Sequence, residues 1–161
     1  EPETKPKPAA EAKPKQAPEP ESKSKSLAKA DLNGDIAHKK GLRHYKGDGV
    51  PRNFLTARAW FEKAAVRGHA AAQYNLGIMA FAGQGMKVNL QAAVDWFRRA
   101  ASKEYAPAQY NLGFMFYQGK GVKKDDLQAY TWMNRAANLG YEKAKKARDM
   151  IAKAMPREAL N

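Results

Sequence analysis

The sequence contains no cysteine. This absence excludes a disulfide-stapled scaffold, thiol catalysis and any metal site built from thiolate ligands. Long apolar runs are also missing, because no stretch approaches the roughly 20 residues that a membrane-spanning helix needs. Acidic residues are scarce: 16 Asp and Glu oppose 29 Lys and Arg, which gives a formal net charge of +13. A cationic field of this size favours acidic proteins, anionic polymers, lipid headgroups or nucleic acid as partners.

The first 26 residues differ sharply in composition from the rest of the chain. They hold six of the nine prolines and have no Val, Ile, Leu, Met or aromatic residue. Such a segment cannot bury enough apolar surface to offset the entropy of ordering, so we predict a disordered linker over 1–26 that acts as a tether. A folded domain is predicted over 27–155 and a disordered end over 156–161. Because the chain starts at Glu1 rather than Met, a preceding signal peptide, membrane anchor or further domain stays open.

A repeat with a period of 36 residues runs through the predicted domain. The pattern Gly-x-Gly followed by Val or Met begins at Gly47, Gly83 and Gly119. The same spacing relates three tryptophans and three further glycines: Trp60, Trp96, Trp132, Gly41, Gly77 and Gly113. A period of this length is typical of helical-hairpin arrays, in which each unit buries its apolar face against its neighbours. We predict units at about 34–69, 70–105 and 106–141, and a capping helix at 141–155.

Each unit is predicted to form two helices joined by its Gly-x-Gly loop. In the second unit, residues 70–82 form the first helix. Glycine inside a helix costs about 1 kcal/mol relative to alanine, so Gly77 is expected to contact another helix closely. The second helices are expected to begin at side-chain caps supplied by Asn53, Asn89 and Asp125.

The second helix of the second unit carries an apolar stripe that includes Trp96 and Phe97. Because alanine pairs flank it, Trp96 is predicted to be the large residue around which small neighbours let the helices approach. Gly68 and Gly140 are expected to end the second helices of the first and third units. Glu104 replaces this glycine in the second unit, which predicts a frayed or differently capped turn there.

The repeated pattern AxYNLGxxxxxGxGVxxDxxxAxxWxxxAAxxG is clearest at 108–140 and 72–101. It resembles the Sel-one-like repeat, a relative of the tetratricopeptide repeat, over roughly residues 34–140. The resemblance implies an all-α fold, a right-handed α-solenoid of three 36-residue helix-turn-helix repeats plus a C-terminal capping helix. It also implies a non-catalytic scaffold, frequently in bacterial envelope or signalling complexes.

No recurrent chemistry accompanies the repeat. His38 and His44 are six residues apart, which places them on different helix faces, so the histidines lack metal-ligand spacing. Asp125 and Asp126 are interpreted as helix-capping residues rather than paired catalytic carboxylates. The Gly-x-Gly loops lack the spacing and the preceding strand of a phosphate-binding loop. We therefore predict no catalytic residue, no cofactor and no metal, and we do not expect an enzyme.

The first helices of the units are expected to line the concave surface, which suits a bound peptide or helix. The preferred interpretation of Tyr45, Phe81 and Tyr117 is core between units. Four further residues are interpreted either as core or as partner-binding surface, and the sequence does not decide between the two: Tyr74, Ile78, Tyr110 and Phe114.

One repeat position on the first helices is polar and holds Lys39, Asn75 and Asn111. By resemblance to tetratricopeptide domains, these residues are candidates to hold the carboxylates of a bound peptide, and the alternative is a solvated polar line. The predicted partner-binding set is Lys39, Arg43, Tyr74, Asn75, Ile78, Tyr110, Asn111 and Phe114.

The basic residues are spread over every unit and the capping helix. Nucleic-acid binding would need them gathered on one face with stacking aromatics. We therefore predict a protein or peptide partner, preferably acidic, as the first choice. The alternative is a cationic module that binds an anionic envelope polymer or a membrane surface, with nucleic acid last. The Lys-Pro-Glu linker favours a periplasmic, tethered location, with a cytoplasmic scaffold as the alternative.

Overall fold

The structure, a computed structural model, describes residues 21–156, and the side chains from residue 32 onward. This part of the chain forms seven helices and no strand. In chain order they are α1 (Glu21–Lys46), α2 (Phe54–Ala65), α3 (Ala70–Ala82), α4 (Leu90–Ala101), α5 (Ala106–Gln118), α6 (Asp126–Asn138) and α7 (Glu142–Ala154). The all-α repeat fold predicted from the sequence is thereby confirmed.

The described helix α1 begins within the predicted linker. The linker was expected to reach residue 26, whereas α1 begins at Glu21. Its first six residues lack the apolar side chains of a core helix, but they also lack proline, which is the residue that prevents a helix. Residues 1–20 of the predicted linker and residues 157–161 of the predicted disordered end lie outside the described residues.

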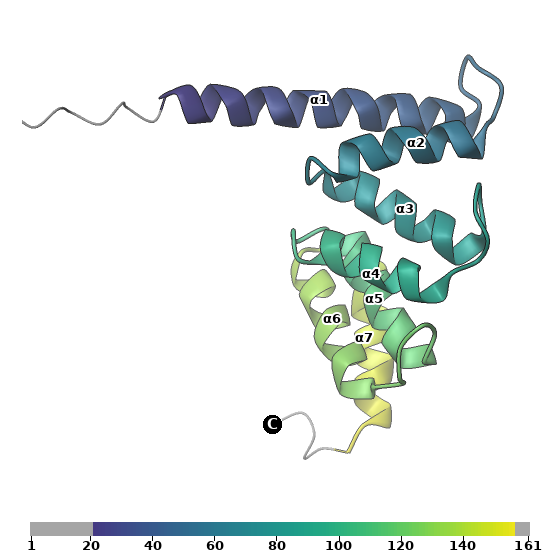
Figure 1. The fold of residues 1–161 in the computed structure, drawn as a ribbon. Helices are drawn as coiled ribbons and strands as arrows, with labels where there is room; N and C mark the ends of the chain where they lie inside the picture. Colours follow the sequence, from purple (N-terminus) through teal and green to yellow (C-terminus); the bar gives the residue numbers. More distant parts are fainter. Residues whose placement is uncertain (1–20, 157–161) are drawn as a thin grey trace, which may run out of the picture.

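Successive helices stack into a right-handed α-solenoid (Figure 1). Each extensive helix–helix contact joins helices that are neighbours in the sequence, from the α1–α2 pair to the α6–α7 pair. The first half of α1 extends past this stack (Figure 1). The core therefore runs as a chain of clusters between consecutive helix pairs rather than as one central cluster.

The glycine inside each first helix lets the second helix of the same unit approach closely. A Cβ atom at Gly77 would lie 2.5 Å from Phe97 Cε1, and one at Gly41 would lie 2.6 Å from Phe61. At Gly113 the corresponding neighbour is Met133. The prediction that Gly77 marks a close helix–helix contact is confirmed.

The tryptophan prediction is wrong in its choice of residue. Phe97, the neighbour of Trp96, is the side chain that fills the contact, with 1% of its surface exposed. Trp96 is only half-buried, and the Arg99 guanidinium lies 4.8 Å from the centre of its ring. The two residues are 100° apart on the helix, and only the geometry of packing decides which of them points at the glycine.

The three predicted helix caps are confirmed. The side-chain oxygens of Asn53, Asn89 and Asp125 each accept a hydrogen bond from the backbone N–H three residues on, at 2.9 Å. The Gly-x-Gly loops of the second and third units pack against the preceding unit, at Phe54 and Leu90. A Cβ atom at Gly121 would clash with the Leu90 carbonyl oxygen, and the φ of 69° at Gly121 also favours glycine.

The turn after α4 does not fray, contrary to the prediction. Glu104 adopts a φ of 58°, in the region that Gly68 and Gly140 occupy at 81° and 84°. Its N–H bonds the Ala101 carbonyl at 3.1 Å, as the glycines bond the equivalent carbonyls. The shared turn geometry therefore imposes a left-handed conformation on a residue that bears a Cβ atom.

A buried glutamine ties each of two units to the one before it. The Gln73 and Gln109 amides donate hydrogen bonds of 3.2 Å to the carbonyls of Ala65 and Ala101, near the ends of α2 and α4. Both side chains are buried. These contacts fix how one unit sits on the next.

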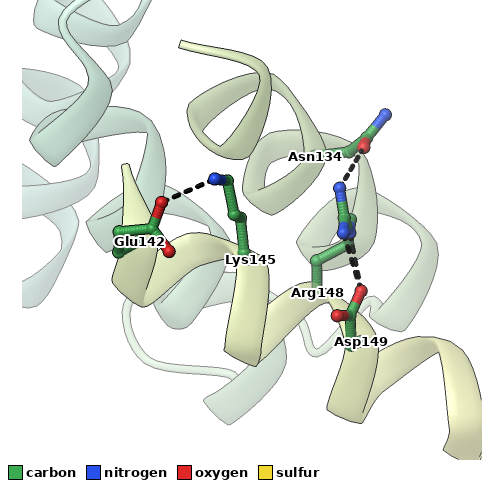
Figure 2. A network of polar contacts seen from close by, with 5 residues as sticks. All are labelled: Asn134, Glu142, Lys145, Arg148 and Asp149. Atoms are coloured by element: carbon green, nitrogen blue, oxygen red, sulfur yellow. Dashed lines mark hydrogen bonds and ion pairs between the residues drawn. The ribbon is translucent and has the colours of Figure 1, made fainter. Parts of the chain in front are cut away.

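The last helix, α7, is held by a mixture of apolar and polar contacts. Ala144 and Ile151 are buried against α6. On the polar side, Arg148 donates to the Asn134 side chain of α6 at 3.4 Å and pairs with Asp149 at 2.8 Å, while Lys145 pairs with Glu142 (Figure 2). This polar outer side is what a terminal repeat needs.

Candidate partner-binding face and pocket

Pairs of neighbouring rings recur along the first helices at the repeat spacing. His38 of α1 packs against His69, with ring centres 4.3 Å apart and the ring planes tilted by 31°. In the next units the equivalent pairs are Tyr74 with Tyr105 and Tyr110 with Tyr141, each at 5.4 Å. The second ring of each pair belongs to the residue directly before α3, α5 or α7. The rings thus link each first helix to the start of the next one.

The tyrosines on this face are half-buried, and the ring centres of Tyr74 and Tyr105 lie 5.4 Å apart. Burial raises the pKa of Tyr74, and the nearby hydroxyls of Tyr141 and Tyr105 add to the effect, whereas a hydrogen bond with the Asn111 side chain opposes it. Burial also raises the pKa of Tyr105, with a contribution from Tyr141. These hydroxyls are therefore neutral at physiological pH and available as hydrogen-bond donors or acceptors.

The first ring pair has additional polar contacts. Nδ1 of His69 accepts from the Ala72 N–H at 3.1 Å and so caps α3, while Nε2 lies 3.1 Å from an Asp35 oxygen. The Asn75 amide nitrogen lies 3.0 Å from Nε2 of His38. An amide nitrogen only donates, so this contact assigns Nε2 of His38 as the acceptor. Burial, helped by nearby His69, lowers the pKa of His38 to about 4.

An open pocket of about 120 Å³ lies between α3 and α5, and we call it the α3–α5 pocket. It gathers three residues of the predicted partner-binding set: Ile78, Asn111 and Phe114. The other lining residues are Phe81, Phe97 and Met115. Phe97 and Met115 are each 1% exposed and form its floor, whereas the remaining side chains are half-buried. The lining is apolar except for the Asn111 amide.

A lysine lies at the edge of the α3–α5 pocket. The Lys120 ammonium is 5.4 Å from the centre of the Phe81 ring and 5.5 Å from that of Phe114, and both rings line the pocket. Among the ion pairs of the described side chains, none involves Lys120. An anion bound beside the pocket would therefore meet a positioned positive charge.

The other members of the predicted set are distributed differently. Lys39 is exposed on α1, at the repeat position of Asn75 and Asn111. Arg43 is also exposed, but its equivalents one and two units on are Met79 and Met115, which are buried. Arg43 therefore lies on the end of the solenoid that a preceding unit would cover, and the structure does not bring it together with the pocket residues.

Sequence reasoning missed two groups of residues on this face. His69, Tyr105 and Tyr141 share the 36-residue spacing, so a complete comparison of the repeats would have found the second ring of each pair. Lys120 was not singled out, because it occupies the variable position of a Gly-x-Gly loop. Lys120 could have been recognised from its difference from Gln84, which holds the same position one unit earlier.

Two further features are absent from the described residues: a cluster of metal ligands and a helix able to cross a membrane. Within its side chains, no group of three or more His, Asp or Glu is placed to hold a metal ion. None of the helices from α1 to α7 combines the length and hydropathy of a membrane span.

Known proteins share this architecture. The Sel1 repeat family matches residues 38–69, 70–105 and 106–141. A Sel1 repeat protein from Oxalobacter formigenes is 35% identical, with a TM-score of 0.71 over 73% of this chain and 49% of that one. The c5321 antigen of uropathogenic Escherichia coli is 37% identical, with a TM-score of 0.66 over 66% of this chain and 23% of that protein.

A third structure, cysteine rich protein B of Helicobacter pylori, is 24% identical, with a TM-score of 0.62 over 76% of this chain and 95% of that one, and shows the fold alone. A comparison with curated proteins gives no match. The chain spans less than half of each of the first two relatives. Sel1 repeat proteins are in general protein-interaction scaffolds and are typically non-catalytic. From its three matched repeats, the chain belongs to the Sel1 repeat family.

Proposed function

We propose that this chain is a non-catalytic scaffold that binds a partner protein or peptide along the face formed by α1, α3 and α5. The observation that carries the proposal is the α3–α5 pocket, where partly exposed apolar side chains of α3 and α5 lie beside an amide and a lysine. An open apolar pocket with a small number of polar groups at its edge is typical of a binding site. Lys39, Asn75 and Asn111 would contribute polar contacts along the same face.

The partner is proposed to be acidic, since the chain carries a formal charge of +13. We further propose that the complex belongs to the bacterial envelope, with the domain tethered in the periplasm. The bacterial origin of the relatives and the Lys-Pro-Glu composition of residues 1–26 support this placement. Cell fractionation that recovers the protein only from the cytoplasm would contradict it.

A second function is favoured by a cationic line on the second helices. Lys63, Arg99 and Arg135 follow the repeat spacing, and each lies over the ring of the tryptophan three residues before it, 4.4 to 4.8 Å from the ring centre. An anionic polymer or lipid surface would meet regularly spaced charges there. Binding of this kind weakens steeply as salt rises.

One capture experiment tests both functions. The tagged full chain is compared with a variant of the first helices (Lys39→Glu, Asn75→Ala, Asn111→Ala) and with a variant of the second helices (Lys63→Gln, Arg99→Gln, Arg135→Gln). Circular dichroism checks that each variant folds. We expect the first variant alone to lose the captured proteins. Capture that survives in the first variant and is lost in the second contradicts the proposed scaffold face and supports the cationic module.

A further inference from the structure

We propose that the α3–α5 pocket holds one bulky apolar side chain of an acidic peptide, and that Lys120 pairs with a carboxylate next to that side chain. This inference rests on the proposed function, because it assigns the chemistry of the partner at one place on the same face. It also fixes where along the solenoid the peptide is anchored.

The size and lining of the pocket determine the anchor. Its volume is about 120 Å³. An apolar protein cavity of about 150 Å³ accepts a whole benzene molecule. This pocket is slightly smaller but open on one side, so it can take one branched aliphatic side chain or one aromatic ring that stays partly outside it. Phe97 and Met115 close the floor, and the partly buried side chains of Ile78, Phe81 and Phe114 form the walls. The Asn111 amide is the single polar group of the lining and can bond the peptide backbone beside the anchor.

The charge at the edge of the pocket determines what flanks the anchor. The Lys120 ammonium lies over two of the pocket's aromatic rings, at 5.4 and 5.5 Å from their centres. The ring faces attract the cation and hold it close to the opening. Lys120 forms no ion pair with another described side chain. A peptide carboxylate one residue from the anchor could therefore pair with the Lys120 ammonium.

The contact between α1 and α3, one repeat earlier, shows how the surroundings of Lys120 differ from the rest of the repeat. At that contact, the Tyr45 hydroxyl donates a hydrogen bond of 2.7 Å to the Gln84 side-chain oxygen. The equivalent residues one unit on are Phe81 and Lys120. Phe81 has no hydroxyl and Lys120 has no acceptor, so the bond that ties α1 to its neighbouring loop has no counterpart at α3. The substitution leaves an apolar wall and a cation facing the opening.

The test uses a defined probe, the peptide acetyl-Gly-Asp-Phe-Asp-Gly-amide, titrated at low salt into the ¹⁵N-labelled full chain. We expect saturable shifts of the amide signals around Phe81, Asn111 and Lys120. Peptides with Asn-Phe-Asn or Asp-Ala-Asp at the centre remove the charges or the anchor separately. Each is expected to bind at least about fivefold more weakly, the effect of roughly 1 kcal/mol.

Variants decide whether Lys120 acts locally. Lys120→Gln is expected to weaken the Asp-Phe-Asp peptide about fivefold, as an exposed charge pair of up to about 1 kcal/mol allows. Lys123→Gln removes the same charge from an exposed position of the same loop and should leave binding unchanged. The double variant Phe81→Tyr, Lys120→Gln recreates the Tyr45–Gln84 pair and should abolish saturable binding while the fold is retained.

The outcomes separate this inference from the proposed function. Equal weakening by Lys120→Gln and Lys123→Gln, or shifts that map outside the pocket, would overturn the pocket assignment. Absence of saturable binding by the native chain would overturn it as well. In each case, capture that still depends on Lys39, Asn75 and Asn111 leaves the scaffold function standing. Conversely, specific peptide binding without face-dependent capture would support the pocket and count against the proposed function.

Discussion

Acidification is expected to loosen the first unit before the other two. The reason is the His38–His69 pair, which occupies the position of tyrosine pairs in the later units. His38 is half-buried against Phe61 and accepts a hydrogen bond from Asn75, so its uncharged form fits the site. Asp35 favours the charged form, but burial and His69 outweigh it.

The magnitude follows from the two pKa values of His38. In the folded chain the value is about 4, below the ordinary 6.5 of an unfolded chain. Between these values the unfolded state binds more protons, so the stabilisation is fully present above pH 6.5 and is lost as the pH falls towards 4. The full difference corresponds to about 3 kcal/mol. Because His38 is only half-buried and water screens part of the effect, we expect a loss of about 1–2 kcal/mol.

The assay is urea unfolding at several pH values between 7.5 and 4, followed by circular dichroism and tryptophan fluorescence. Carboxylates throughout the chain also respond to pH, so the informative quantity is the difference between the native chain and His38→Tyr, which restores the tyrosine of later units. His44→Gln serves as the matched control and should keep the native pH dependence. If native and His38→Tyr chains lose equal free energy of unfolding across this range, the assignment to His38 is refuted.

Four further substitutions test the packing of the repeat, each by the free energy of unfolding. Glu104→Gly should stabilise the chain by about 1 kcal/mol, because it removes left-handed strain, and Gly140→Ala, with open space around it, should cost a similar amount. Destabilisation by Glu104→Gly, or stabilisation by Gly140→Ala, would contradict the strain argument. Gly77→Ala should cost about 1–3 kcal/mol, since its new methyl group would meet Phe97, and unchanged stability would show that the ring can yield. Asn89→Ala should cost about 1 kcal/mol through the lost cap of α4, and a change below a few tenths would rule out a stabilising role for that hydrogen bond.

Sequence reasoning reached the architecture because three units repeat the same local chemistry. Asn53, Asn89 and Asp125 occupy one position, and cap residues act through the backbone directly beside them. Their roles therefore follow from the sequence without knowledge of distant contacts. Gly77 could also be interpreted, since a glycine inside an otherwise good helix needs a packing reason.

The errors arose where contacts across helices decide the outcome. Trp96 and Phe97 both lie on the apolar stripe, and only the position of Gly77 on the facing helix selects Phe97 as the buried ring. Glu104 was expected to disrupt its turn, but the hydrogen bonds around that turn hold the left-handed conformation. In both cases the local sequence pattern is compatible with two structures, and contacts between helices determine which of them forms.

The candidate site was only partly predictable, because a repeat is recognised from the positions that its units share, whereas the site depends on positions where the units differ. Ile78, Asn111 and Phe114 do meet at one pocket, whereas Arg43 lies apart at the end of the solenoid. Lys120, which gives the pocket its charge, sits at a position that a repeat pattern leaves blank. The role of Lys120 becomes visible only when the pocket is known and Lys120 is compared with Gln84 of the preceding unit.

Departures from the repeat are therefore not all of one kind. Glu104 keeps the turn of its glycine equivalents and adds only conformational strain, so its replacement by glycine should leave binding unchanged. Lys120 instead accompanies the loss of the hydrogen bond that Tyr45 and Gln84 make one unit earlier, and it leaves a charge beside an open apolar pocket. A departure that changes what a surface presents, at no evident cost to the backbone, is the kind that selection for a partner would retain. Giving the contact between α1 and α3 the residues found between α3 and α5 tests this distinction. The double variant Tyr45→Phe, Gln84→Lys should create a second peptide site between α1 and α3. A variant that still binds only one peptide would show that residues other than this pair define the pocket.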